Sequence, residues 1–171
     1  MQSFQPNFSL IWQYFSEICS IPRPSGKEEK IREYLLDFAS KEGFASKVDK
    51  AGNVLITRAG SAPAIGLQAH MDMVCEKNNG VDFNFDTDSI KTVVDGEWVR
   101  AEGTTLGGEN GIGMAGAMAI LIDETIKHGP LEALFTVDEE TGLTGAFALK
   151  EGFMKGKYLL NLDSEDEGEI F

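Results

Sequence analysis

The sequence has 171 residues, of which 42% are hydrophobic and 25% are charged, so it is long enough to bury the core of one soluble domain. Its formal net charge of -13 argues against binding to nucleic acid or to an anionic membrane, because both require a basic surface. It has two cysteines, no amino-terminal signal peptide and no apolar run of about 20 residues, which predicts a reduced, cytoplasmic protein without a membrane span.

The first part of the chain predicts two helices followed by two strands. Apolar residues recur at helical spacing over residues 8–19, and the proline-containing segment 21–24 ends this helix. Residues 25–28 have the pattern of a capping box, a hydroxyl followed three residues later by a carboxylate, which predicts the start of the second helix. Strands are expected at 53–57 and 65–69.

The second part of the chain alternates strands with helices. We expect a strand near 97–101, a helix rich in small residues at 111–128, an apolar strand at 131–137, a short helix at 146–150 and a strand at 158–162. The nearly continuous apolar strand is typical of a sheet that is covered on both faces. Together these elements predict α/β architecture with a mixed, largely parallel sheet flanked by helices.

Polar residues gather where the predicted strands end. His70–Asp72, Asp138–Glu140 and Asp163 each follow an apolar strand, and Glu109 lies in the glycine-rich turn 107–111 before the long helix. Ligand sites of open α/β sheets lie outside the carboxyl ends of the strands. We therefore expect these four clusters to converge.

The residue types in these clusters suit a divalent metal. The imidazole of His70 is a good ligand for Zn²⁺, Mn²⁺ or Co²⁺. Asp72 lies two residues further on, so in extended chain its side chain faces the same way as that of His70. Its carboxylate can then accept a hydrogen bond from the other ring nitrogen and fix the tautomer. The adjacent Glu139 and Glu140 should point to different sides, which suits one metal ligand and one proton acceptor. Asp163 and Glu109 supply further carboxylate ligands. A metal ion at such a site lowers the pKa of the water that it binds.

A nucleotide-binding module is the alternative from another class. The run from Gly111 to Gly116 matches the dinucleotide-binding fingerprint, and Asp138 follows it at a strand end. The fingerprint requires a strand that leads directly into its first glycine, whereas here the polar turn 102–110 intervenes. Close packing of the helix explains these glycines better.

Six segments, in chain order, resemble the aminoacyl-histidine dipeptidases, which are also called Xaa-His dipeptidases or cytosol non-specific dipeptidases. These enzymes are a bacterial branch of the M20 di-metal peptidases. The segments are residues 67–74, 95–99, 103–107, 110–113, 139–142 and 161–165. The resemblance covers essentially the whole chain. It implies hydrolysis of dipeptides, of the Xaa-His type, by a metal-activated water, and it implies that residues 1–171 are the amino-terminal part of the catalytic domain, without the lid domain.

The resemblance also implies a set of metal ligands. His70 and Asp163 would bind one metal ion, Glu140 would bind a second, and the position of Glu109 would bridge the two. The family has aspartate at the bridging position, and Glu109 is one methylene longer. This departure leaves its ability to bridge two ions as an open question, because a shift of about 1 Å at a reacting centre is costly.

Two further roles follow from the same resemblance. Asp72 would orient and polarise His70, and Glu139 would be the general base that later returns its proton to the leaving amine. The second-metal histidine of the family lies in a later part of the sequence. His128, which is expected to cap the end of the long helix, is not a candidate for that ligand.

Family members are more than twice as long as this chain. The family binds two ions, and we expect these 171 residues to bind one or fewer, with Zn²⁺ preferred and Mn²⁺ or Co²⁺ as alternatives. Impaired hydrolysis follows, and the alternative reading is a non-catalytic metal-binding fragment or a degenerate peptidase. An apolar sheet edge or face exposed by the missing part also predicts self-association.

Overall fold

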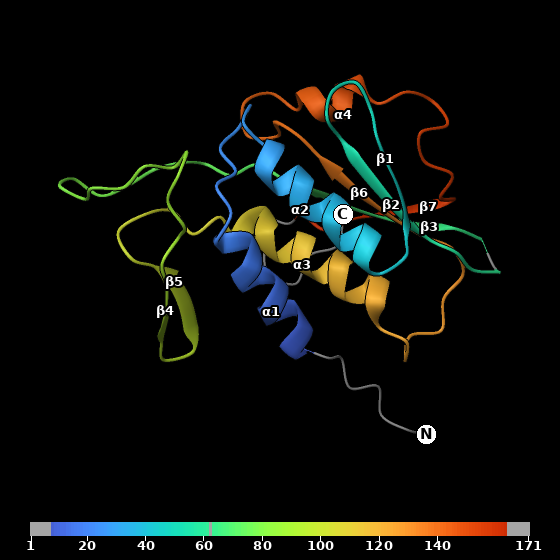
Figure 1. Cartoon of the computed structure of the whole chain (residues 1–171), viewed down its shortest axis with the longest axis horizontal. Coiled ribbons are helices and arrows are strands. Elements are labelled where there is room, and N and C mark those ends of the chain that lie inside the picture. The colour runs from blue at the N-terminus through green and yellow to red at the C-terminus, as the bar shows by residue number, and fades with distance from the viewer. Residues whose placement is uncertain (1–7, 62, 164–171) are drawn as a thin grey trace.

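The computed structural model describes residues 8–61 and 63–163, which form one mixed sheet, four helices and a separate hairpin. The helices are α1 (Phe8–Cys19), α2 (Glu29–Lys41), α3 (Gly108–Ile122) and α4 (Thr144–Ala148). The sheet contains β1 (Ala45–Val48), β2 (Val54–Arg58), β3 (Ile65–His70), β6 (Leu131–Thr136) and β7 (Tyr158–Asn161). The hairpin consists of β4 (Thr92–Asp95) and β5 (Trp98–Ala101). In Figure 1 the helices α1, α2 and α3 lie together on one side of the sheet, and α4 lies apart from them at the top of the view.

The strand order in the sheet is β1-β2-β6-β3-β7. β3 pairs in parallel with both β6 and β7, whereas β1 with β2 and β2 with β6 are antiparallel pairs. The predicted α/β fold, with a mixed sheet and flanking helices, is confirmed. The three strands that precede the polar clusters run in one direction, so their carboxyl ends share one edge of the sheet.

The core lies between the sheet and the helices α1, α2 and α3. β6 is buried along its whole length, and Phe135 from its helix-facing side joins the same core cluster as Met114 and Met118 of α3. Full burial of such side chains stabilises the fold by roughly 1.5–3 kcal/mol each. On the opposite side of β6 the carboxylate of Glu132 accepts the backbone N–H groups of residues 155 and 156, so the segment before β7 crosses that face.

One expectation about the elements is corrected, and two strands were missed. The long helix ends at Ile122 rather than at residue 128, because the carboxylate of Asp123 accepts the backbone N–H and the hydroxyl of Thr125 and closes a local turn there. β1 was not predicted, and all four of its residues are exposed, so it has no buried alternation to reveal it. The same holds for the exposed β4.

None of the helices in the described ranges is long and apolar enough to cross a membrane.

Candidate metal centre

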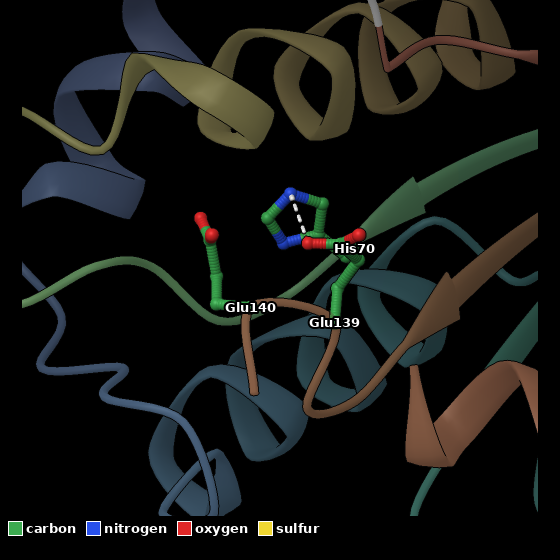
Figure 2. Close-up of side chains that lie close together, drawn as sticks. All are labelled: His70, Glu139 and Glu140. Carbon is green, nitrogen blue, oxygen red and sulfur yellow. Dashed lines mark ion pairs between the residues drawn. The ribbon is translucent and has the colours of Figure 1, made fainter. Parts of the chain in front are cut away.

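The polar clusters predicted from the sequence converge at the carboxyl edge of the three parallel strands. His70 is the last residue of β3 and is paired with Thr136 of β6, so residues 138–140 follow at the same level. Asp163 comes two residues after the end of β7. In Figure 2 the side chains of Glu139 and Glu140 rise from the loop after β6 toward the ring of His70.

His70 and Asp72 form a buried pair. Both residues are 0% exposed, and His70 Nδ1 lies 3.2 Å from Asp72 Oδ1. An ionised carboxylate can only accept, so Nδ1 carries the proton of this hydrogen bond. The other ring nitrogen, Nε2, is buried and has no hydrogen-bond partner among the described residues. Its nearest acidic neighbours are Asp163 Oδ2 at 3.7 Å and Glu139 Oε2 at 4.0 Å.

Asp72 organises the loop that follows β6. Its Oδ1 accepts the backbone N–H of Glu139 at 3.0 Å, and its Oδ2 accepts the backbone N–H of Glu140 at 3.1 Å and the hydroxyl of Ser25 at 2.7 Å. Burial alone would raise the pKa of Asp72, but the hydrogen bonds from His70, from the two N–H groups and from Ser25 outweigh it and lower the pKa to about 2. Asp72 is therefore ionised throughout the neutral range.

The same pair changes the ionisation of His70. Burial by itself lowers the pKa of this imidazole. The hydrogen bond to Asp72 and the negative charges of Asp72, Asp163 and Glu139 act in the opposite direction and win, so that the pKa of His70 is raised above 6.5. A cation is therefore favoured at this ring, as a proton or as a metal ion.

Glu139 and Glu140 do not diverge as expected. Ligand atoms of His70, Glu139 and Glu140 all lie within 4.8 Å of one another, so both glutamates reach the same space. The alternation rule applies to extended chain, but Asp138 has a φ of 53° and the two following N–H groups both point at Asp72. Burial, together with the charges of neighbouring carboxylates, raises the pKa of Glu139 against the opposing effect of His70.

Glu109 and Asp163 meet across the edge of the sheet. Gly107 has a φ of 66° and lets the chain turn into α3, so that Glu109 lies in its first turn. The pKa of Glu109 is raised by burial and by the charge and hydrogen bond of Asp163. The amide of Asn110 holds this region together, because its Nδ2 donates to Asp163 Oδ1 at 2.9 Å and to the carbonyl oxygen of Leu162 at 3.2 Å.

Two supporting residues were missed because the capping-box prediction is wrong. Ser25 donates to Asp72, and Glu28 forms no side-chain cap at the start of α2. Instead Glu28, which is 4% exposed, accepts the backbone N–H of Gly26 at 2.8 Å and that of Asp138 at 3.0 Å. The local spacing fits a cap equally well, so only the tertiary contacts distinguish the two roles.

Arg23 was also missed. It is 1% exposed and donates to the carbonyl oxygens of Met71, Asp72 and Gly107. The signal that could have found it is a single arginine between Pro22 and Pro24, in a short connection that follows an amphipathic helix.

The remaining sequence candidates lie outside this cluster. His128 lies in the loop before the amino end of β6, at the opposite edge of the sheet. The glycine fingerprint is preceded by a loop after Ala101 rather than by a strand. A Cβ at Gly111 would lie 3.1 Å from the ring of Phe15, and one at Gly113 would lie 2.2 Å from Asn110 Oδ1, so both glycines serve close packing.

The donor set fits a divalent metal ion. A buried ring nitrogen without a partner is costly, and here it faces carboxylates from the loops after β6 and β7. Imidazole and carboxylate together suit Zn²⁺, Mn²⁺ or Co²⁺. A cation among these groups would offset the like-charge repulsion that raises the pKa of Glu109 and Glu139.

Known proteins share the sequence and the fold of this chain. The chain is 48% identical to the cytosol non-specific dipeptidase of Escherichia coli strain K12 over 94% of this chain and 34% of that protein. The structure of aminoacylhistidine dipeptidase from Vibrio alginolyticus superposes with a TM-score of 0.91 at 48% identity, over 96% of this chain and 34% of that one. A tripeptidase from Staphylococcus aureus shares the fold, with a TM-score of 0.81 at 23% identity over 95% of this chain and 45% of that one.

The chain thus spans about a third of the length of the two dipeptidases that it matches. Residues 66–168 match the family model described as peptidase family M20/M25/M40, and they include all four polar clusters. On this match the chain belongs to peptidase family M20/M25/M40.

Proposed function

We propose that this chain provides part of the active centre of a cytoplasmic, metal-dependent dipeptidase that acts on dipeptides of the Xaa-His type. The observation that carries the proposal is the buried Nε2 of His70, which faces Glu139 and Asp163 without a hydrogen-bond partner in the described chain. The names of the E. coli and Vibrio relatives support the substrate class. Because the chain spans 34% of each, the activity belongs to the longer protein, with residues 1–171 as the amino-terminal part of its catalytic domain.

The proposed ligands of the first ion are His70 and Asp163. Glu140 is the proposed ligand of a second ion, and Glu109 lies beside Asp163, where it can contribute a further oxygen. Zn²⁺ is the favoured ion, with Mn²⁺ and Co²⁺ as alternatives, since all three accept imidazole and carboxylate. Bound at this edge, the ion supplies Lewis acidity that lowers the pKa of water and polarises a peptide carbonyl.

The chain's own groups would then move and hold the protons. Asp72 keeps the proton of His70 on Nδ1, which leaves the lone pair of Nε2 directed at the proposed ligand position. Glu139 has a raised pKa and a partly exposed carboxylate, so it can accept a proton from water and later return it to the leaving amine. Ser25 helps to fix the carboxylate of Asp72 by donating its hydroxyl to Oδ2.

Calorimetric titration of Zn²⁺ into the metal-stripped chain tests this proposal. We expect one site, and we expect Asp163→Ala to abolish it. Asp86→Ala is the matched control, because Asp86 is an exposed carboxylate in an ion pair with Lys27, and this variant should bind like the wild type. A wild-type chain without a site, or a site that survives Asp163→Ala, contradicts the assignment. Dipeptide hydrolysis by the 171 residues should be far slower than by a full-length relative.

The alternative, a non-catalytic metal-binding fragment, predicts the same titration. It differs in hydrolysis, since it predicts none even when a longer form of the protein is assayed. Hydrolysis of a Xaa-His dipeptide by the longer form, lost on Glu139→Gln, would distinguish the peptidase.

A further inference from the structure

Arg23 contacts the backbone next to the candidate metal centre and belongs to none of the polar clusters that form it. Its side chain is 1% exposed, yet within the described residues its guanidinium forms no ion pair. Nη1 donates to the carbonyl oxygens of Met71 at 3.1 Å and Asp72 at 2.8 Å, and Nη2 donates to the carbonyl oxygen of Gly107. A buried charge costs several kcal/mol unless its surroundings compensate it, so a purely apolar side chain would be the cheaper filling here.

The surroundings of Arg23 leave room for this particular group. A Cβ at Gly107 would lie 2.4 Å from Nη2, and a Cβ at Gly111 would lie 2.9 Å from it. The main chain of Arg23 adds a further link, because its carbonyl oxygen accepts the backbone N–H of Met73 at 3.2 Å. Pro24 forms a parallel bridge with Met73. Residue 23 therefore binds the segment after β3 through both its backbone and its side chain.

The carbonyls that Arg23 joins belong to two different parts of the site. Met71 and Asp72 directly follow His70, and Gly107 precedes Glu109 by two residues in the turn into α3. The planar guanidinium has donors in a fixed arrangement, so it can set the separation of these two segments. Lysine has a single nitrogen at the end of a flexible chain and cannot bind the three carbonyls in the same geometry.

We propose that Arg23 is a positioning residue of the metal centre, which fixes the segment of His70 relative to the turn of Glu109. The inference rests on the proposed function, because it concerns the affinity and geometry of the metal site. Within the described residues Arg23 donates its side-chain hydrogen bonds to main-chain carbonyl oxygens and to none of the proposed ligand side chains, so it acts through the backbone of the two segments that it joins.

Arg58 offers a matched control at the other end of α3. Its Nη1 donates to the carbonyl oxygens of Leu121 at 2.7 Å and Asp123 at 3.1 Å. Like Arg23 it binds main-chain carbonyls, but it is only partly buried and lies at the end of the helix away from the site. Arg58→Lys and Arg23→Lys remove equivalent types of contact, and only the second should disturb the metal.

The experiment is a titration of metal-stripped chain with Co²⁺, followed by its visible absorption bands, which report coordination geometry. We expect Arg23→Lys to weaken Co²⁺ binding about 10–100-fold, the range found when groups that orient metal ligands are removed, and to shift the bands. Arg58→Lys should keep both the affinity and the spectrum of the wild type. Circular dichroism and urea unfolding of each variant separate loss of fold from loss of metal.

Gly111→Ala tests the same point if Arg23→Lys fails to fold. It keeps the arginine but places a methyl group 2.9 Å from Nη2, so the guanidinium must shift and Co²⁺ binding should weaken. Wild-type affinity and spectrum in a folded Arg23→Lys or Gly111→Ala variant would overturn the inference while leaving the metal site intact. A wild-type chain that binds no Co²⁺ would instead overturn the proposed function, and this inference with it.

Discussion

The carboxylate of Asp72 accepts hydrogen bonds from four groups that come from three separate segments of the chain. The spacing of His70 and Asp72 was enough to predict that the two side chains meet. The backbone N–H groups of Glu139 and Glu140 could not be predicted as partners, because they depend on the parallel pairing of β3 with β6 and on the left-handed conformation of Asp138. The contribution of Ser25 was hidden by its fit to a helix cap.

The protonation of His70 gives a testable pH dependence. Its pKa in the folded, metal-free chain is raised above 6.5, so its stabilising effect is fully present below pH 6.5 and is lost as the pH rises through the folded pKa. Since a metal ligand must be neutral imidazole, Zn²⁺ affinity should increase over the same window as the proton leaves. NMR titration in a His128→Gln background, which leaves His70 as the sole histidine, should give a midpoint above 6.5.

Asp72→Asn is the informative variant for this titration. It removes the charge and the ionic acceptor that raise the pKa of His70, so the midpoint should fall, whereas Asp86→Asn at the exposed ion pair should leave it unchanged. A midpoint at or below 6.5 in the metal-free parent would contradict the predicted raised pKa.

At the scale of elements, apolar periodicity predicted the strands that carry the site. β3, β6 and β7 lie close to their expected ranges, because each is largely apolar and is bounded by turn residues. Capping and helix length were less predictable. The carboxylate of Glu28 binds the loop after β6 instead of the start of α2, and Asp123 ends α3 early through Thr125. In both cases a side-chain contact overrides a local sequence preference.

Two glycines of α3 allow a comparison within one helix. A Cβ at Gly113 would lie 2.2 Å from Asn110 Oδ1 and 3.1 Å from Leu162 Cβ, whereas one at Gly116 would meet nothing within 4 Å. We expect Gly116→Ala to raise the free energy of unfolding by about 0.5–1 kcal/mol, the usual difference between alanine and glycine in a helix. Gly113→Ala should lower it by about 1–3 kcal/mol, the usual cost of overpacking.

The two alanine variants should also differ in metal binding. Displacement of Asn110 by Gly113→Ala loosens the hydrogen bond that holds Asp163, so Zn²⁺ affinity should fall, and Gly116→Ala should leave it unchanged. Urea unfolding and calorimetry on both variants check these expectations. Equal effects of the two substitutions would show that close approach at Gly113 has no special importance.

At the scale of the whole molecule, the sheet was predictable and its surroundings were not. Alternating strands and helices indicated the α/β fold, while the hairpin of β4 and β5 is largely exposed and has little buried pattern.

The last strand of the sheet, β7, is exposed along its whole length. β7 pairs only with β3 within the described chain, and its Tyr158, Leu159 and Leu160 are 58%, 56% and 52% exposed. This is an apolar strand with an open edge.

An open apolar edge favours pairing with another copy, so the 171-residue chain should self-associate as its concentration rises. Leu160→Lys places a charge on this edge and should weaken association about tenfold, which is about 1.4 kcal/mol. Phe147→Lys is the control, because Phe147 is 82% exposed on α4, away from β7. Sedimentation velocity over a concentration series measures both. If the lysine at position 147 weakens association as much as the lysine at 160, general apolar exposure is responsible; an effect confined to 160 assigns the contact to the β7 edge.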